Sequence, residues 1–230
     1  EIKQLQPKIK DSTNWEQEIA KYSDEDYEML LLTLPPDSAK LKREHFLSYL
    51  TNRQNESEFA KFFDDTLRDI AIFNNEIFAV KTEEGSKVVL FDELSTFITG
   101  SAQKRDNFCK ALVNQLIEFN FEKIFNQKFD FFSTIFEYLI KDYNKDGGGK
   151  YAEYYTPKAV AQIIASILVD NPVNNVTCYD PAAGSGTLLM SLAHVIGEER
   201  CTIYSQDISQ KSSSMLRLNL ILNNLVHSKP

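Results

Sequence analysis

The segment Asp180-Pro181-Ala182-Ala183-Gly184-Ser185-Gly186 could bind a ligand through backbone atoms. It follows a short apolar run at residues 176–179 and precedes a helical pattern that begins at Thr187. Where a strand turns into a helix, glycines let a ligand approach the bare backbone. The helix N-terminus offers N–H groups to a carboxylate or a phosphate. The spacing therefore predicts a ligand site at the end of a strand, although an ordinary turn remains the alternative for a lone G-x-G.

A carboxylate, Asp207, follows the next apolar run and lies 21 residues after Gly186. An acidic side chain at the end of the second strand can accept hydrogen bonds from both hydroxyls of a ribose. The dinucleotide fingerprint requires a third glycine where this chain has Leu189, so NAD and FAD are disfavoured. The chain also has no G-x-x-x-x-G-K-[ST] phosphate loop. The sequence therefore predicts a site for another nucleoside-containing cofactor.

The elements around this site alternate between helix and strand. Apolar residues at positions 160, 163, 164, 167 and 168 predict an amphipathic helix that starts near Thr156-Pro157. Strands follow at residues 176–179 and Cys201–Ser205, with a helix over 187–195 between them and a further helix capped by Ser209. This order is typical of an α/β fold with a parallel sheet.

The chain before this region is mainly helical in its pattern. The apolar residues Phe59, Phe63 and Leu67 fall on one face of a helix, and a second helix is predicted over 103–119. A small β-hairpin is predicted near 77–91, around Gly85. The run Asn144-Lys145-Asp146-Gly147-Gly148-Gly149-Lys150 predicts a flexible linker. We therefore expect a helical domain over 1–145 and a second domain over 146–230.

Composition and charge exclude several classes of protein. The 230 residues are 43% hydrophobic, which excludes global disorder, and no apolar run is long enough for a membrane span. The three cysteines form neither a disulfide framework nor a zinc pattern, so we expect no metal site and a reducing, cytoplasmic environment. Residues 1–145 carry 19 Lys and Arg against 26 Asp and Glu. This acidic balance argues against a domain that binds nucleic acid by itself.

Four stretches together resemble one family of enzymes. DPAAGSGTLL at 180–189 resembles the cofactor motif of S-adenosylmethionine-dependent amino-methyltransferases of DNA. The stretch at 147–160, GGGKYAEYYTPKAV, resembles the Tyr/Phe-Thr-Pro segment in the methylation subunit of type I restriction-modification systems. YSQD at 204–207 and RLNL at 217–220 are similar to the same family. The resemblance covers about residues 131–225, and residues before it match only in general character.

The resemblance implies a fold, a cofactor and a set of site residues. The fold would be a helical N-terminal domain followed by the first part of a Rossmann-like S-adenosylmethionine-dependent methyltransferase sheet, truncated in this sequence. The residues implied to bind S-adenosylmethionine are Glu153, Tyr154, Tyr155, Thr156, Pro157, Asp180, Pro181, Gly184, Ser185, Gly186 and Asp207. The tyrosines, Thr156 and Pro157 would line the methionine end, and Asp207 would bind the ribose. Asp180 would orient the turn or hold the methionine ammonium group.

The sequence departs from this family at the catalytic motif. The family uses an Asn/Asp/Ser-Pro-Pro-Tyr/Phe motif after its fourth strand, to hold the amino group of the flipped base. The only Pro-Pro here lies in Leu34-Pro35-Pro36-Asp37, which lacks the polar residue and the aromatic ring. Two predicted strands are also fewer than the five or six of an average sheet. We therefore expect the front part of a longer adenine-N6 methyltransferase, inactive alone, and nominate no catalytic residue.

The resemblance also implies partners, and two alternatives stay open. DNA would be bound through the full complex, with a DNA-specificity subunit, a second copy of the methylation subunit and possibly a restriction subunit. One alternative is an S-adenosylmethionine-dependent methyltransferase of glutamine or RNA, which would share the cofactor turn. The other is a non-catalytic module whose acidic, aromatic-rich helical half docks a specificity subunit.

Overall fold

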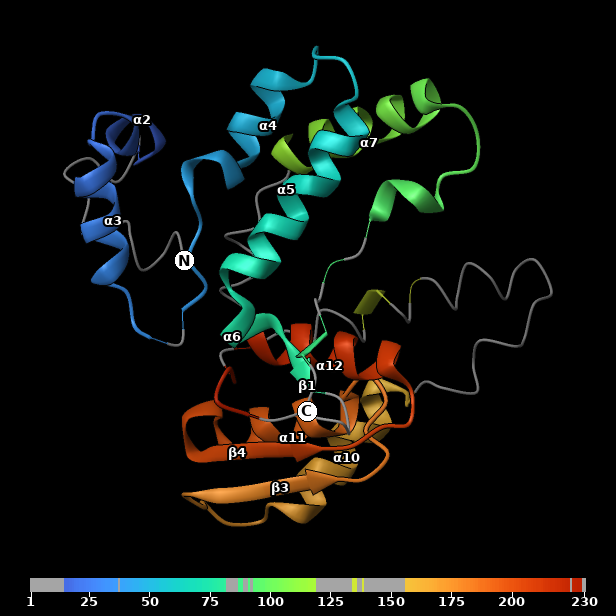
Figure 1. The fold of residues 1–230 in the computed structure, drawn as a ribbon. Coiled ribbons are helices and arrows are strands. Elements are labelled where there is room, and N and C mark those ends of the chain that lie inside the picture. Colours follow the sequence, from blue (N-terminus) through green and yellow to red (C-terminus); the bar gives the residue numbers. More distant parts are fainter. Residues whose placement is uncertain are drawn as a thin grey trace.

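The computed structural model describes residues 15–36, 38–81, 87–88, 91, 93–118, 134–135, 138, 156–223 and 225–228. These residues form a helical half and an α/β half, which Figure 1 shows above and below one another. The predicted linker at 144–150 lies outside the described residues. Within the described part of the chain, no helix has the length and apolar character needed to cross a bilayer.

The helical half consists of short helices around two small cores. Its helices are α2 (Trp15–Ala20), α3 (Asp24–Leu32), α4 (Leu47–Arg53), α5 (Phe59–Phe73), α6 (Asn75–Phe78) and α7 (Ala102–Glu118), with 3-10 turns η2 (Arg43–His45) and η3 (Leu94–Phe97). Helices α5 and α7 pack against each other and against α4. Phe59 and Phe63, one helical turn apart, are buried with Cys109 and Val113 of α7. The helix predicted over 103–119 is therefore confirmed, and so is the apolar face of α5.

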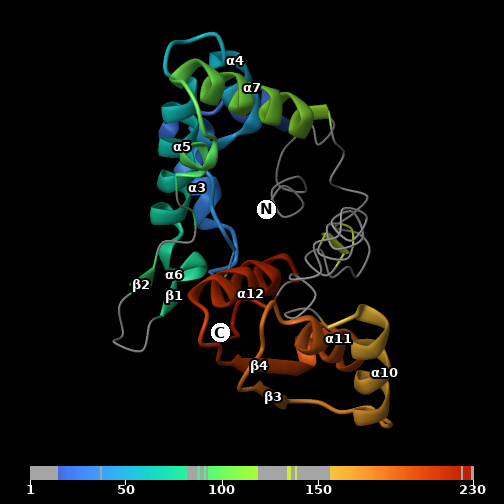
Figure 2. The same cartoon turned by 90° about the vertical axis from the view of Figure 1, so that its right-hand side faces the viewer.

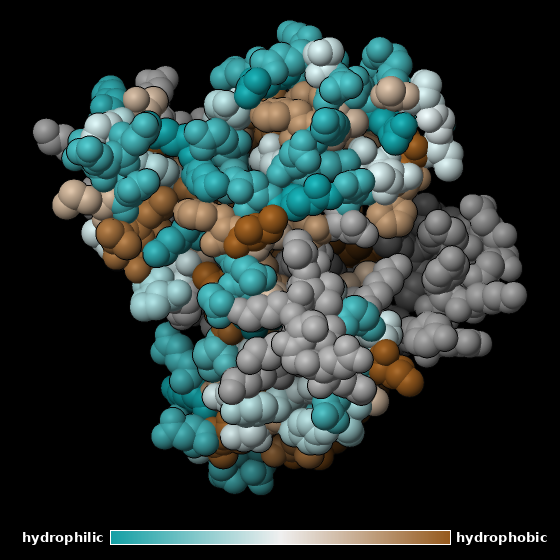
Figure 3. Space-filling model, viewed as in Figure 1, coloured by the Kyte–Doolittle hydropathy of each residue, from teal (hydrophilic) through white to brown (hydrophobic). Residues whose placement is uncertain are grey.

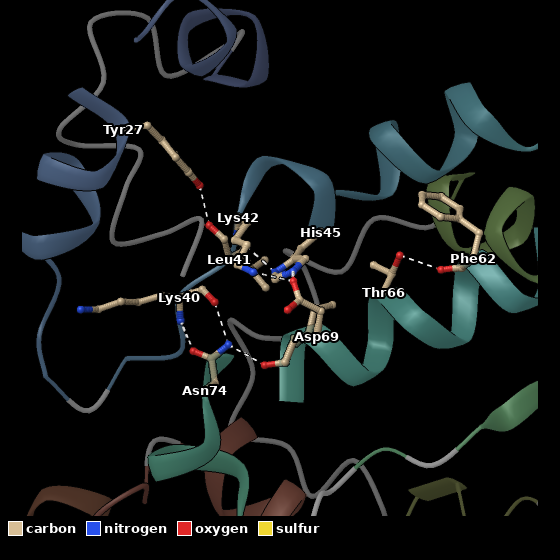
Figure 4. Close-up of polar contacts among 10 residues, drawn as sticks. Tyr27, Lys40, Leu41, Lys42, His45, Phe62, Thr66, Asp69 and Asn74 are labelled. Carbon is tan, nitrogen blue, oxygen red and sulfur yellow. Dashed lines mark hydrogen bonds and ion pairs between the residues drawn. The ribbon is translucent and has the colours of Figure 1, made fainter. Parts of the chain in front are cut away.

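Residues 40–45 join α3 to the C-terminal end of α5 through polar contacts (Figure 4). The buried side chain of Asn74 accepts from the Lys40 N–H at 2.6 Å and donates to the Lys40 carbonyl at 2.8 Å. His45 Nε2 lies 2.8 Å from Asp69 Oδ2, and the Lys42 N–H donates to His45 Nδ1, so Nε2 carries the proton. Lys42 Nζ and then His45 bond to Asp69 and lower the pKa of its carboxyl. These contacts fix the 40–45 segment on α5.

The first strand of the hairpin predicted near 77–91 begins later than the sequence pattern indicates. β1 (Val80–Lys81) pairs antiparallel with β2 (Lys87–Val88). Ile77 and Phe78, which the pattern predicts to start the first strand, belong instead to helix α6. Both N–H groups donate to the carbonyl of Asn74 at 2.9 Å, and both side chains are buried. Burial on one helical turn therefore outweighs the β-propensity of this apolar pair.

The α/β half has the predicted order of helices and strands. It runs α10 (Lys158–Leu168), β3 (Val176–Asp180), α11 (Thr187–Ile196), the 3-10 turn η5 (Glu198–Arg200), β4 (Cys201–Ser205) and α12 (Gln210–Leu222). β3 and β4 pair in parallel, with Val176 opposite Cys201 and Asp180 opposite Ser205. The core of this half lies between the strands and helices α11 and α12, with Ile203, Met190 and Leu220 fully buried. The predicted parallel α/β arrangement is therefore confirmed for these two strands.

Helix α10 uses an unexpected face for packing. Ala161 and Ala165 are fully buried, and α10 lies against α11. Its larger apolar residues point outward, with Ile163 61% and Ile167 72% exposed. Alanines allow two helix backbones to approach closely, so the small face makes the contact although the aliphatic face is more hydrophobic. The helix also begins at Lys158 rather than at Pro157, without a side-chain cap from Thr156.

The two halves meet where α6 and β1 contact α12. Figure 2 shows α6 directly beside α12, while the rest of the helical half extends away from the strands. On the face drawn in Figure 3, the described surface is mostly hydrophilic, with small separate hydrophobic patches. The three cysteines are free and buried.

Candidate functional site

The turn after β3 has the tight backbone that its sequence predicts. Asp180 closes the strand, and its Oδ1 accepts the Ala182 N–H at 2.9 Å, so this carboxylate orients the turn. Gly184 and Gly186 have φ values of +56° and +84°, in the region that glycine adopts most readily. The Gly186 N–H donates to the Ala183 carbonyl at 2.8 Å, and α11 begins at the next residue. Among the described residues, the N-cap position of α11, Gly186, has no side chain to cap the first turn of the helix.

The end of β4 lies directly against this turn. Pairing continues past the two strands, because the Gln206 N–H donates to the Asp180 carbonyl at 2.9 Å. The Ala183 N–H in turn donates to the Gln206 carbonyl at 3.0 Å. These two bonds place Asp207, the residue after Gln206, at the middle of the glycine-rich turn.

The Asp207 carboxylate joins the two strand ends. Its Oδ2 accepts the Gly184 N–H at 2.8 Å, and its Oδ1 accepts the Ser209 N–H at 2.8 Å. The side chain is half-buried, so one side of it remains in contact with solvent. A carboxylate has about four lone-pair positions. Two backbone bonds therefore leave acceptor capacity for two more donors, such as the hydroxyls of a ribose.

Helix α12 forms the wall behind the turn. A Cβ atom on Gly186 would overlap Leu216 Cδ1, so this glycine is needed for packing as well as for its positive φ. The fully buried Asn219 donates from Nδ2 to the Ser185 carbonyl at 3.3 Å. Ser209 caps the helix by accepting the Ser212 N–H, as its sequence position predicts. Sequence reasoning assigned no role to Leu216 or Asn219, because their contacts depend on how α12 folds back onto the turn.

The predicted cofactor residues fall into three groups in the structure. Asp180, Pro181 and residues 184–186 lie on the turn, and Asp207 is bonded to it. Thr156 and Pro157 are exposed just before α10, and among the described residues no hydrogen bond joins them to the turn. Glu153, Tyr154 and Tyr155 lie outside the described residues.

Ile208 is a candidate site residue that the sequence analysis did not identify. Its side chain is fully exposed, although the residue is large and apolar. It directly follows Asp207 in the chain. An apolar side chain after the acidic residue was the signal that could have identified it.

A second concave region lies in the helical half, away from the turn. A cavity of about 400 Å³ opens between α5, η3 and α7, and none of the turn residues lines it. Asp64 accepts from the Ser95 N–H at 3.1 Å and from the Ser95 hydroxyl at 2.5 Å, and Asp106 accepts the Ala60 N–H at 2.9 Å. These carboxylates hold η3 and α7 on α5, which is a structural role. The described residues contain no group of three or more His, Cys, Asp or Glu arranged to hold a metal.

The C-terminal part of the chain matches a known protein family. Residues 127–229 match the N-6 DNA Methylase family. A stretch of 119 residues is 28% identical to the methylase subunit of the type I restriction enzyme MpnII from Mycoplasma pneumoniae. That stretch covers 50% of this chain and 22% of the relative.

A solved structure has the same fold over most of the chain. It is the crystal structure of the methyltransferase subunit of a type I restriction-modification system from Streptococcus thermophilus. The TM-score is 0.69 at 21% identity, and the match covers 94% of this chain and 45% of the other. The present chain therefore spans less than half the length of that subunit. The resemblance to the methylation subunits of type I restriction-modification systems is confirmed.

Proposed function

We propose that this chain, whose residues 127–229 match the N-6 DNA Methylase family, carries the S-adenosylmethionine-binding part of an adenine-specific DNA methyltransferase subunit. The subunit would act in a type I restriction-modification system in the cytoplasm. One observation carries the proposal: the carboxylate that ends β4 is bonded to the glycine-rich turn that ends β3. In open α/β sheets, ligands bind at the carboxyl ends of neighbouring strands.

The residues present fit this cofactor. The positive-φ backbone at Gly184 and Gly186 would let the cofactor approach the turn closely, and Ser185 lies between them. Asp207 would accept from the ribose hydroxyls with its remaining lone pairs, and the exposed Ile208 would cover one face of the adenine ring. Asp180, Pro181, Thr156 and Pro157 would line the methionine end, together with Glu153, Tyr154 and Tyr155.

When bound, S-adenosylmethionine supplies an electrophilic methyl group for transfer to the exocyclic amine of adenine. The residues of this chain would bind and orient the cofactor, which contributes to the rate by alignment. We propose no catalytic residue among them. The amine-binding Pro-Pro motif has no counterpart in this sequence.

The proposal extends to domain organisation and partners. Residues 1–145 would form an assembly domain and residues 146–230 the first part of a Rossmann-like methyltransferase domain. The acidic balance of residues 1–145 suits contact with a basic protein better than contact with DNA. DNA would therefore be bound through a specificity subunit, alongside a second methylation subunit and, in the restricting complex, a restriction subunit.

Binding of S-adenosylhomocysteine, the demethylated cofactor, tests the proposal. Calorimetry should be performed on the natural protein that contains this sequence, comparing wild type with Asp207→Ala. A hydrogen bond to a charged group contributes about 1.5–3 kcal/mol, and each 1.4 kcal/mol changes Kd about tenfold. We expect Asp207→Ala to weaken binding at least about tenfold. Asp170→Asn, which alters an exposed carboxylate outside the turn, serves as control and should bind like wild type.

A second ligand separates ribose recognition from the support that Asp207 gives the turn. The 2′,3′-dideoxy analogue of S-adenosylhomocysteine lacks the hydroxyls that Asp207 would bind. The loss caused by Asp207→Ala should therefore be much smaller with this analogue, as in a double-mutant cycle. An equal loss with both ligands would show that Asp207 acts only on the turn. No binding of S-adenosylhomocysteine by wild type would overturn the proposed function.

A further inference from the structure

Helix α12 contacts both the glycine-rich turn and the helical half. Toward the turn, Leu216 lies against Gly186, and Asn219 bonds to the Ser185 carbonyl. On its other side, α12 packs against α6 and β1. Leu216, Arg217 and Asn219 lie within about one helical turn of each other on α12. The same part of α12 therefore contacts both the glycine-rich turn and α6. A displacement of α12 would therefore affect both sites together.

Arg217 makes the polar connection between the halves. Its Nε donates to the Ile77 carbonyl of α6 at 2.6 Å, across 140 residues of sequence. Its Nη1 donates to the carbonyls of Val226 at 3.0 Å and Ser228 at 2.8 Å. The residue is only 5% exposed, and burial lowers the pKa of its guanidinium from the ordinary value. The three carbonyls compensate part of the cost of burying this charge.

The C-terminal segment held by Arg217 lies along β4. The Ser228 hydroxyl accepts the Ile203 N–H at 3.0 Å, and His227 Nε2 lies 3.1 Å from the Cys201 carbonyl. Arg217 therefore fixes three elements at once: α6, the 225–228 segment and, through that segment, β4. Since β4 leads directly to Asp207, the strand end that carries this carboxylate depends on a segment that Arg217 holds.

We propose that Arg217 is a positioning residue that couples docking of the helical half at α6 to cofactor binding at the glycine-rich turn. The inference rests on the proposed function, because it takes the turn as the cofactor site. The cofactor orders the turn, the turn holds Leu216 and Asn219, and α12 then holds Arg217 against the Ile77 carbonyl. Coupling of this kind is reciprocal, so α6 docking raises cofactor affinity by the same factor.

Lysine cannot replace arginine in this role. The bonded carbonyls lie on two different segments, and the guanidinium reaches them from Nε and Nη1. An ammonium group is a single donor centre on a flexible chain and cannot reproduce the fixed planar arrangement. Arg217→Lys should therefore retain the charge but lose most of the coupling.

Amide hydrogen exchange in the natural protein that contains this sequence tests the inference, with S-adenosylhomocysteine as the probe. Saturating ligand should slow exchange at Ile77, Phe78 and Ala79 in wild type by at least about fivefold, the lower end of usual couplings. In Arg217→Met and Arg217→Lys this protection should disappear, and Kd should rise at least about fivefold. A purely structural role would lower the melting temperature but leave the ligand-dependent protection unchanged.

Arg43→Met provides the matched control. Arg43 also donates to backbone carbonyls, those of Tyr22 at 2.5 Å and Ser23 at 3.1 Å, but it lies in η2 and bonds to residues 22–24 at the start of α3. This variant should lose stability and keep the ligand-dependent protection of α6. If the Arg217 variants do not fold, the wild-type measurement decides. Binding of the ligand without any protection of α6 overturns the inference, whereas absence of binding contradicts the proposed function instead.

Discussion

Gly186 is constrained by two parts of the molecule. Its φ of +84° favours glycine, and a side chain would overlap Leu216 of α12. The local G-x-G pattern identified Gly186 in the sequence, but only as a position where a ligand could approach the backbone. The second reason depends on a contact across 30 residues and could not be predicted from local pattern. The sequence identified Arg217 and Asn219 only as part of the RLNL stretch. Their roles could not be predicted for the same reason, since their bonds span 140 and 34 residues.

We expect Gly186→Ala to lower the free energy of unfolding by at least about 2 kcal/mol. Backbone strain at positive φ costs about 1–3 kcal/mol, and overpacking adds about 1–3 kcal/mol. Urea unfolding followed by circular dichroism measures the loss. Gly197→Ala is the matched control, because Gly197 has a φ of +100° but its nearest neighbouring atom would lie 3.6 Å from a Cβ.

The difference between these two variants isolates the overlap with Leu216. Adding Leu216→Ala to Gly186→Ala should recover part of the stability relative to the sum of the single changes. Equal losses in Gly186→Ala and Gly197→Ala, with strict additivity in the double variant, would contradict the contact between α12 and the turn.

At the scale of elements, strong local patterns predicted where helices and strands occur. They predicted less well which face of a helix packs against its neighbours. The strand at Cys201–Ser205 and the helix α7 occur as predicted because apolar periodicity and length determine them locally. The packing face of α10 and the helical state of Ile77 and Phe78 depend on neighbours far away in sequence. Helix α10 contacts α11 through alanines, and α6 is held against α12. Hydrophobic periodicity predicts which side of a helix or strand is apolar, but it does not predict which element packs against the helix or strand.

Asn74→Ala should destabilise the connection between the 40–45 segment and α5. The buried Asn74 side chain bonds both the N–H and the carbonyl of Lys40 and also the Ile70 carbonyl. Leaving such groups without partners costs about 1–3 kcal/mol, which should appear as a lower midpoint of urea unfolding. Gln103→Ala removes an exposed side-chain bond and should change stability by less than about 0.5 kcal/mol. A loss for Asn74→Ala as small as that of the control would contradict the contacts in Figure 4.

At the scale of the whole molecule, the family and the candidate site could be recognised from sequence. The glycine-rich turn and Asp207 both lie within residues 180–207, so the motif spacing in the sequence was enough to predict that they belong to one site. The arrangement of the two halves could not be predicted, because it depends on buried contacts between α6 and α12. The cofactor-binding roles of all the predicted site residues, from Glu153 to Asp207, remain predictions.

The purified 230-residue chain should transfer no methyl group to DNA. The motivation is the absence of a Pro-Pro motif with its polar and aromatic neighbours. Incubation with labelled S-adenosylmethionine and unmethylated DNA measures incorporation against a reaction without protein. A known adenine-N6 methyltransferase serves as positive control. Incorporation above background that disappears in Asp207→Ala would contradict this expectation.

The bond between Arg217 and Ile77 also has a consequence for synthesis of the protein. The carbonyl of Ile77 leaves the ribosome 140 residues before its partner. At a synthesis rate of about 5–20 residues per second, Arg217 of α12 is made about 7–28 s after Ile77 of α6. During this interval the Ile77 carbonyl lacks its Arg217 donor, and α6 lacks its contact with α12. The helical half therefore emerges from the ribosome with the α12-facing side of α6 uncovered, and this side is covered only after α12 has been made.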